Sequence, residues 1–212
     1  MQSVRQIFFD LDGTLWPPES VVLPAFRQTF QQLGLPLPAE ATLLKTLGYP
    51  VDEIWRMLLP GLPAAVRCRA RSLMGEAELA ILRSGGGAAF PGVRETLLRL
   101  REAGIQLYIL SNCETDYLQL VPDALGLADC FDGRYCADQF PGLTKAEILQ
   151  QILQRRPLPA AMVGDRFHDI EAGKLNNLFT VGCRFGHGDD AELAGADCVI
   201  DSFLQLTSIF GV

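Results

Sequence analysis

The chain has 212 residues, of which 49% are apolar and 20% charged, a composition typical of a globular protein with one full core and room for a smaller second unit. Its net charge of -7 argues against a non-specific nucleic-acid partner, because such binding needs a basic surface. No stretch reaches the roughly 18 uncharged apolar residues of a membrane helix, so we expect no membrane span.

The N-terminal segment and the cysteines both indicate a cytoplasmic protein. Arg5, Asp10 and Asp12 place charges where a secretion signal would carry an apolar run. The six cysteines are scattered and include no C-x-x-C pair. Without a secretion signal, we expect them to be free thiols in a reducing compartment rather than a disulfide framework.

The first predicted element is a short strand, Ile7 to Phe9, apolar enough to be buried on both faces. It ends in two carboxylates, Asp10 and Asp12, and a period of two places both on one side of an extended chain. Gly13 then lets the backbone turn sharply and approach a ligand closely. Taken alone, the segment is equally consistent with a strand that ends in an Asp-Gly turn.

A helical segment follows, in which apolar residues at helical spacing predict four helices near residues 23–33, 43–47, 54–58 and 64–83. A Pro-Pro turn precedes it, and a run of three glycines, which cannot hold a helix, ends it. We therefore predict a small helical domain over residues 16–88, inserted into a core domain made of residues 1–15 and 89–212. Its two connections are placed to act as a hinge.

Three arginines, Arg67, Arg69 and Arg71, crowd the first half of the fourth predicted helix. We interpret them as a solvated face rather than as an anion site.

From Phe90 onward, predicted helices alternate with predicted strands. The strands are expected at 106–110, 133–137, 160–163, 179–183 and 198–200, and the helices at 93–103, 117–125, 145–154, 170–176, 191–194 and 202–210. This alternation indicates an α/β fold in which a parallel, Rossmann-like sheet carries helices on both faces.

Polar side chains follow the predicted strands at the sheet edge where open α/β sheets bind ligands. Ser111 and Asn112 follow one strand, Asp165 and Asp169 follow another, and Lys145 begins a helix between them. Each has a structural alternative, namely a Ser-Asn turn, a surface lysine, and Asp169 as a helix N-cap. Their combination with the two acids after the first strand predicts a site for Mg²⁺ and a phosphoryl group.

The chemistry of phosphoryl transfer explains these residue types. Mg²⁺ prefers hard oxygen ligands and keeps several waters, which suits a few carboxylates that also meet a substrate phosphate. An aspartate can attack phosphorus and form an aspartyl-phosphate, and a second carboxyl can protonate the leaving alcohol and then deprotonate the attacking water. Crowded carboxylates repel one another, so a cation and a lysine are needed to balance their charge.

The residues resemble the four motifs of the haloacid dehalogenase-like (HAD) hydrolase superfamily. DLDGTL at 10–15 looks like the first motif, Ser111-Asn112 the second, Lys145 the third and GDRFHD at 164–169 the fourth. The helical insert looks like the superfamily's cap, and the C-terminal tail is similar to phosphoglycolate-phosphatase-like members. One departure is Ala146 after the lysine, where related phosphatases often place proline.

The resemblance implies metal and catalytic roles for five residues. Asp10 would be the nucleophile and a Mg²⁺ ligand, and Asp12 the general acid/base that also lends its backbone carbonyl to the metal. Asp165 would be a second carboxylate ligand. Asp169 would hold a metal-bound water or orient Lys145, which would neutralise charge on the nucleophile and the phosphate.

Phosphate binding is implied for Ser111 and the backbone amide of Asn112. Gly13 and Thr14 are grouped with them as substrate-binding residues, in the loop that meets the cap.

The resemblance therefore implies a Mg²⁺-dependent, phosphoglycolate-phosphatase-like enzyme that hydrolyses a small phosphorylated metabolite through an aspartyl-phosphate. A phosphomutase of the β-phosphoglucomutase type and a non-catalytic phosphate-binding or regulatory module are the alternatives. We expect a cytoplasmic monomer or homodimer with no nucleic-acid partner. Lys45 and Arg56 are candidate specificity residues on the cap.

Overall fold

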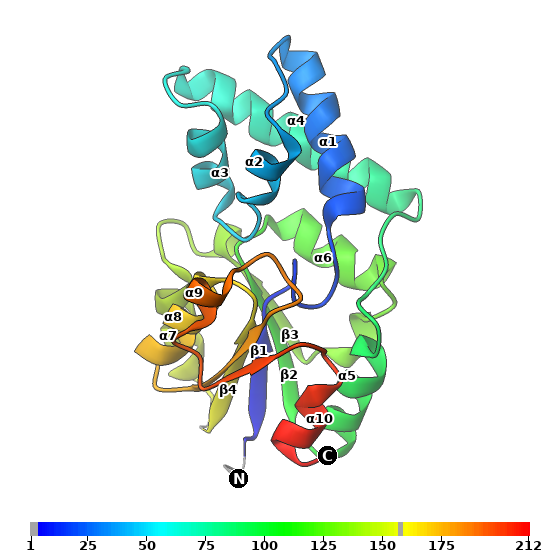
Figure 1. Ribbon diagram of the computed structural model, residues 1–212, viewed down its shortest axis with the longest axis vertical. Coiled ribbons are helices and arrows are strands. Elements are labelled where there is room, and N and C mark those ends of the chain that lie inside the picture. Colours follow the sequence, from blue (N-terminus) through cyan, green and yellow to red (C-terminus); the bar gives the residue numbers. More distant parts are fainter. Residues whose placement is uncertain (1–3, 157–158) are drawn as a thin grey trace.

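Strand β1 (Gln6–Phe9) lies inside a six-stranded parallel sheet within residues 4–156 and 159–212, which are those that the computed structural model describes. The first three residues of the predicted core segment 1–15 lie outside that part. The strand order is β3-β2-β1-β4-β5-β6 (Figure 1), and the other strands are β2 (Gln106–Ser111), β3 (Gly133–Cys136), β4 (Ala160–Gly164), β5 (Phe179–Cys183) and β6 (Cys198–Ile200). The predicted parallel α/β fold is confirmed.

The pleat of the buried strands divides the core into two hydrophobic clusters. Ile7 and Phe9 enter one cluster while Phe8 enters the other. The first cluster is covered by α5 (Val93–Glu102), α6 (Thr115–Ala124) and α10 (Gln205–Phe210), and the second by α7 (Lys145–Leu153) and α8 (Phe167–Leu175). Shorter elements complete the core: α9 (Asp190–Leu193) and the 3₁₀ turns η1 (Ala128–Cys130) and η2 (Ala137–Gln139).

The helical insert forms a third hydrophobic cluster of its own above the sheet (Figure 1). Phe26, Phe30 and Trp55 meet at its centre, with ring centroids 5.9 and 6.1 Å from the indole. Trp55 therefore packs inside the insert. The insert contains the four predicted helices, namely α1 (Glu19–Leu33), α2 (Glu40–Leu44), α3 (Val51–Leu58) and α4 (Ala64–Arg83).

The two connections between insert and sheet lie against each other. The backbone N–H of Phe90 donates to the carbonyl of Leu15 at 3.0 Å. Gly87 has a φ of +96°, and a Cβ there would come within 2.6 Å of the Trp16 ring. Trp16 belongs to the hydrophobic cluster on the sheet and not to the cluster inside the insert. Its ring therefore lies at the base of the insert, beside the two connections.

Two further expectations can be compared with the structure. All six cysteines are free thiols, as predicted. In the described part of the chain, no helix combines the length and the hydropathy that crossing a membrane would require.

Candidate active site

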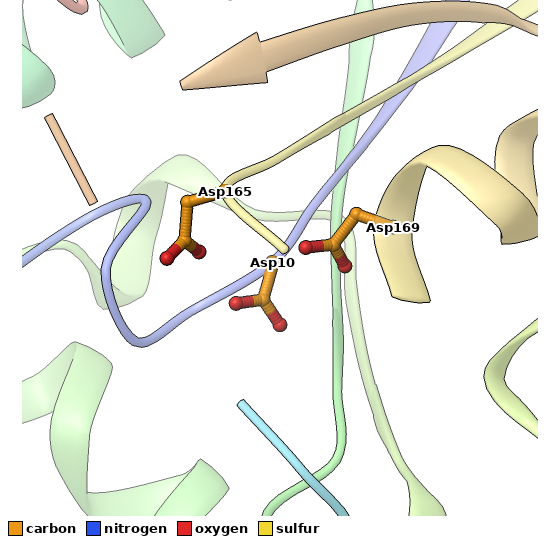
Figure 2. A group of neighbouring side chains, drawn as sticks. All are labelled: Asp10, Asp165 and Asp169. Carbon is orange, nitrogen blue, oxygen red and sulfur yellow. The ribbon is translucent and has the colours of Figure 1, made fainter. Parts of the chain in front are cut away.

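Three buried carboxylates meet at the carboxyl end of the sheet (Figure 2). The register pairs Phe9 of β1 with Val163 of β4, so the two strands end at the same level. Asp10 therefore lies beside Asp165, and Asp169 reaches the same point from the first turn of α8. One carboxylate oxygen from each of the three aspartates lies within 4.8 Å of the others.

Lys145 joins this cluster from the first position of α7. Its ammonium donates to Oδ1 of Asp10 and to Oδ1 of Asp169, each at 2.7 Å. The side chains of Lys145 and Asp10 are each only 4% exposed, and that of Asp169 is 1% exposed. Burial acts to lower the pKa of Lys145, but the two carboxylates hold it above its usual value. The lysine is therefore charged and fixed, not the surface residue that its sequence context allowed.

The cluster carries more negative than positive charge. Burial first, and then neighbouring carboxylates, raise the pKa of Asp10 to about 8 and that of Asp165 to about 7. Three carboxylates face a single ammonium, and their hard oxygen atoms are the ligands that divalent cations such as Mg²⁺ prefer. The residues present therefore fit a bound divalent cation, which would supply the missing positive charge.

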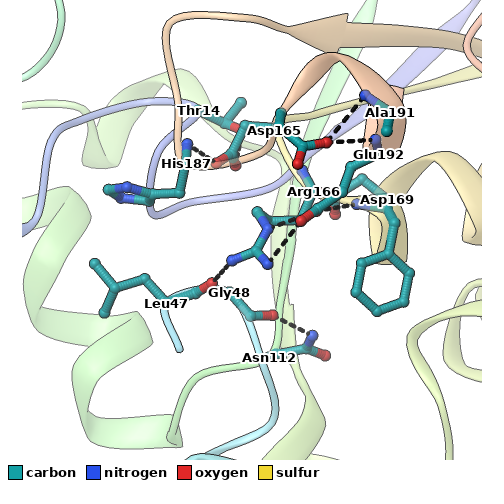
Figure 3. Close-up of polar contacts among 12 residues, drawn as sticks. Thr14, Leu47, Gly48, Asn112, Asp165, Arg166, Asp169, His187, Ala191 and Glu192 are labelled. Atoms are coloured by element: carbon teal, nitrogen blue, oxygen red, sulfur yellow. Dashed lines mark hydrogen bonds and ion pairs between the residues drawn. The ribbon is translucent and has the colours of Figure 1, made fainter. Parts of the chain in front are cut away.

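Backbone and hydroxyl donors fix the carboxylate of Asp165 (Figure 3). Thr14 Oγ1 donates to Asp165 Oδ1 at 3.0 Å, and the backbone N–H of His187 donates to Oδ2 at 2.7 Å. Gly13 has a φ of +80°, and a Cβ there would come within 2.3 Å of Oδ2. The fully buried hydroxyl of Thr14 thus positions an acid of the cluster, a different role from the phosphate contact that we predicted.

Asp169 is an early helical residue rather than the N-cap that we considered. Helix α8 begins at Phe167, three residues before the predicted start, and Arg166 occupies the N-cap position. Asp169 Oδ2 accepts the backbone N–H of Arg166 at 3.0 Å while Oδ1 accepts Lys145. The carboxylate therefore orients Lys145, as the resemblance implied. It also caps the N-terminus of α8, because it accepts a backbone N–H there.

Asp12 is not one of the three clustered carboxylates and has its own donors. Oδ1 of Asp12 accepts the indole N–H of Trp16 at 2.8 Å and the hydroxyl of Tyr117 at 3.0 Å. Removal from water and the nearby charge of Asp10 outweigh these donors and raise the pKa of Asp12 to about 7. Neither donor was predicted. Trp16 lies four residues from Asp12 in the sequence, whereas Tyr117 is 105 residues away and no local pattern connects it to the acid.

Ser111 and Asn112 lie in the same cavity as Asp10 and Asp12. Ser111 Oγ accepts the backbone N–H of Cys113 at 3.3 Å, which leaves its hydroxyl proton free to be donated. The side-chain amide of Asn112 donates to the carbonyl of Gly48 in the insert at 2.8 Å, so its side chain is used for docking the insert.

A second core residue holds the same loop of the insert (Figure 3). Arg166 donates to the carbonyl of Leu47, and its guanidinium lies 5.1 Å from the centre of the Tyr49 ring. Its Nε and Nη2 donate to Glu192 at 2.8 and 3.1 Å, so the guanidinium is also paired with an acid. Arg166 and Asn112 each adjoin a predicted site residue, so the insert loop is anchored directly at the site.

The fold and this arrangement define a hydrolase of the phosphoryl-transfer class built on a parallel α/β sheet, with its acids, lysine and hydroxyl at the ends of the strands. Residues 4–176 match the model of the haloacid dehalogenase-like hydrolases, and the chain belongs to that family. It is a phosphatase, a phosphoric monoester hydrolase.

Curated relatives and solved structures are similar to this chain over nearly its whole length. The phosphoglycolate phosphatase of Vibrio vulnificus is 30% identical over 227 residues, covering 98% of this chain and 96% of that protein. That of Vibrio cholerae is 29% identical over 225 residues, covering 99% and 98%. The haloacid dehalogenase-like family protein SP0104 from Streptococcus pneumoniae has a TM-score of 0.85 at 26% identity, covering 99% of this chain and 100% of that one. CbbY from Rhodobacter sphaeroides, in complex with phosphate, has a TM-score of 0.77 at 25% identity over 96% of both chains.

Proposed function

We propose that the protein is a Mg²⁺-dependent phosphatase that hydrolyses a small phosphorylated metabolite through an aspartyl-phosphate on Asp10. The observation that carries the proposal is the ammonium of Lys145 held at 2.7 Å from both Asp10 and Asp169 inside a carboxylate cluster. The names of the relatives make phosphoglycolate the first metabolite to test. The cytoplasmic location and the monomeric or homodimeric state stay predictions.

The metal would be held by the carboxylates of Asp10 and Asp165, by the backbone carbonyl of Asp12 and, through water, by Asp169. When bound, Mg²⁺ supplies positive charge that favours the ionised form of Asp10 and neutralises phosphate oxygens. Lys145 fixes Oδ1 of Asp10 and adds a second positive charge at the reacting phosphate. The Ser111 hydroxyl and the Asn112 backbone amide hold phosphate oxygens during transfer.

The chemistry then needs two steps from this chain's carboxylates. A carboxylate oxygen of Asp10 forms a bond to phosphorus as the bond from phosphorus to the leaving oxygen breaks, and Asp12 gives its proton to that oxygen. Asp12, now ionised, takes a proton from a water that attacks the aspartyl-phosphate. Phosphate leaves and Asp10 is regenerated. A pKa of about 7 suits a group that must give and take a proton near neutral pH.

We also propose that residues 16–88 act as a cap domain on a core of residues 1–15 and 89–212. The separate hydrophobic cluster of the insert, its two adjacent connections and its loop anchored by Asn112 and Arg166 support this division. A cap that closes over the site would exclude water from the first step and restrict the enzyme to small substrates.

The direct test is hydrolysis of a generic aryl phosphate by the purified protein with Mg²⁺ and with a chelator. We expect turnover with Mg²⁺ and its loss on chelation. A phosphoenzyme that persists and transfers its phosphoryl group to a phosphosugar would instead indicate a mutase. A protein that binds phosphate without turnover would be a non-catalytic module.

Metal binding should also be visible in stability. Without a divalent cation, the carboxyls of Asp10 and Asp165 hold protons in the folded state up to about pH 8 and about pH 7, whereas in the unfolded chain they release them near 3.8. They therefore cost stability progressively as the pH rises through this window, and Mg²⁺ should offset that cost most at the alkaline end. Saturating Mg²⁺ should raise the melting temperature at pH 8 by roughly 5–10 °C, and much less at pH 5.

A matched pair of variants separates this effect from general stabilisation by salt. Asp165→Asn should raise the melting temperature of the chelated protein at pH 8 and abolish the response to Mg²⁺. Asp116→Asn, on the exposed face of α6, should leave both unchanged. A response that is equal at the two pH values, or that survives Asp165→Asn, would contradict the proposed metal site.

The proton donor can be tested through its hydrogen bonds. Tyr117→Phe removes a donor that stabilises ionised Asp12, so the pKa of Asp12 should rise. The alkaline limb of kcat with an alkyl phosphate, whose poor leaving group needs the proton, should move to higher pH by up to about one unit. Tyr135→Phe is the control, because the Tyr135 hydroxyl accepts a hydrogen bond from Arg156 and not one that involves Asp12. An unmoved limb would show that Asp12 is not the acid.

A further inference from the structure

The leaving-group side of the active-site cavity is built by the insert. The cavity that contains Asp12 and Ser111 extends under apolar side chains of the insert, among them Phe26, Trp55 and Met74. If the proposed function holds, the phosphate lies at Ser111 and the leaving oxygen lies next to Asp12. The rest of the leaving group must then extend along these apolar walls. The sequence-based candidates Lys45 and Arg56 do not line this cavity.

Arg71, on α4, is the one cation among the described residues that line the cavity, and it is already neutralised. Its Nε donates to Glu114, its Nη1 to Asp52 at 3.1 Å and its Nη2 to Asp138 at 2.9 Å. Three carboxylates thus surround one guanidinium, so Arg71 is not the solvated residue that we expected. A carboxylate on a leaving group would have to displace one of these acids to gain a positive partner.

Glu78, two turns further along α4, has no partner of opposite charge among the residues that the structure describes, in contrast to Arg71. It lines the same cavity, and within the described part of the chain no cation or hydrogen-bond donor contacts its carboxyl. Burial first, and then the charges of Asp12 and Glu114, raise its pKa well above the usual value. The nearby carboxylates of Asp12 and Glu114, unlike the burial itself, also favour a cation beside this carboxyl.

We propose that this cavity selects phosphomonoesters whose leaving group carries a primary amine on a short apolar spacer, with Glu78 as the residue that receives the ammonium. The apolar walls contact the spacer, and the ammonium supplies the positive partner that Glu78 lacks within residues 4–156 and 159–212. A carboxylate at the same place, as in phosphoglycolate, meets two acids and an arginine that is already paired. The inference rests on the proposed phosphatase function and concerns only its substrate class.

The test compares three series of phosphomonoesters with two-, three- and four-carbon leaving groups: ω-aminoalkyl, n-alkyl and ω-carboxyalkyl phosphates. The range of lengths allows for the reach to Glu78. We expect kcat/KM for the best amino ester to exceed that of the n-alkyl ester of equal length by about tenfold or more, the effect of one charge-assisted hydrogen bond. The carboxyalkyl esters, phosphoglycolate among them, should be the poorest.

Two variants test whether Glu78 is the residue that sets the preference for amino esters. Glu78→Gln should bring the amino-to-alkyl ratio of kcat/KM close to one, and Glu76→Gln, on the exposed face of the same helix, should keep the wild-type ratio. Preference for carboxyalkyl esters, equal use of all three series, or an unchanged ratio in Glu78→Gln would overturn the inference while leaving the phosphatase function intact. Failure to hydrolyse all three series and the aryl phosphate would instead overturn the proposed function.

Discussion

Asp10→Asn should abolish phosphatase activity, lowering kcat by about 10⁴-fold or more, because no other carboxylate in the cluster can take over the attack on phosphorus. Asp165 is held by Thr14 and His187, and Asp169 by Lys145 and the end of α8, so both are fixed for other contacts. The measurement is single-turnover hydrolysis with Mg²⁺, together with acid-quench detection of phosphorylated protein. Neither product nor phosphoenzyme should form.

The substitution should leave the fold intact, which makes the loss interpretable. An asparagine at position 10 keeps an oxygen acceptor for Lys145 and removes one of the crowded negative charges, so the melting temperature of the chelated protein should not fall. Asp190→Asn, which alters an exposed acid paired with Arg184, provides the control for handling and folding. Activity retained in Asp10→Asn would assign the nucleophile to another residue.

Lys145→Met should impair both stability and catalysis. It removes the ammonium that lies between two buried carboxylates, and breaking a buried pair of this kind costs about 3–5 kcal/mol because the remaining charges are left uncompensated. The loss of unfolding free energy should be large at pH 8 in chelator and smaller near pH 5, where the orphaned carboxyls can take up protons. Catalysis should fall by about 10²–10³-fold even with saturating Mg²⁺, since a fixed charge at the reacting phosphate is lost.

Denaturant unfolding at pH 8 and pH 5 measures the loss of unfolding free energy in Lys145→Met, and kcat measures the loss of catalysis. Lys174→Met is the matched control, because Lys174 forms an exposed pair with Asp197 and its loss should cost about 1 kcal/mol or less. An unfolding free energy equally reduced by both variants would show that the buried position of Lys145 has no special role.

The fold was predictable because its signals are local. Apolar strands and the glycine and proline breaks between helices placed almost every element, and the strand ends then brought Asp10, Ser111 and Asp165 to one edge. The start of α8 was missed because Arg166 caps it without the usual small polar side chain, so the helix reaches back to Phe167.

The insert side of the site was not predictable from one sequence. Helix α4 carries arginines and acids on two opposite sides, so its pattern did not show that the side with Arg71 and Glu78 faces the cavity. The partners of Arg71 come from α3, from the residue before α6 and from η2, and only the folded chain places those three together. The same holds for Tyr117, which reaches Asp12 from a helix distant in sequence.

Trp16 links the base of the insert to the proton chemistry. Its ring fills the space left by the missing side chain of Gly87 in the returning connection, and its indole N–H holds Asp12. Any opening that separates the two connections must shift this ring and weaken one of the two hydrogen bonds on the acid. If the proposed cap opens in this way, the pKa of Asp12 should rise as the indole N–H moves away, so that closure of the cap and the protonation of Asp12 would be coupled.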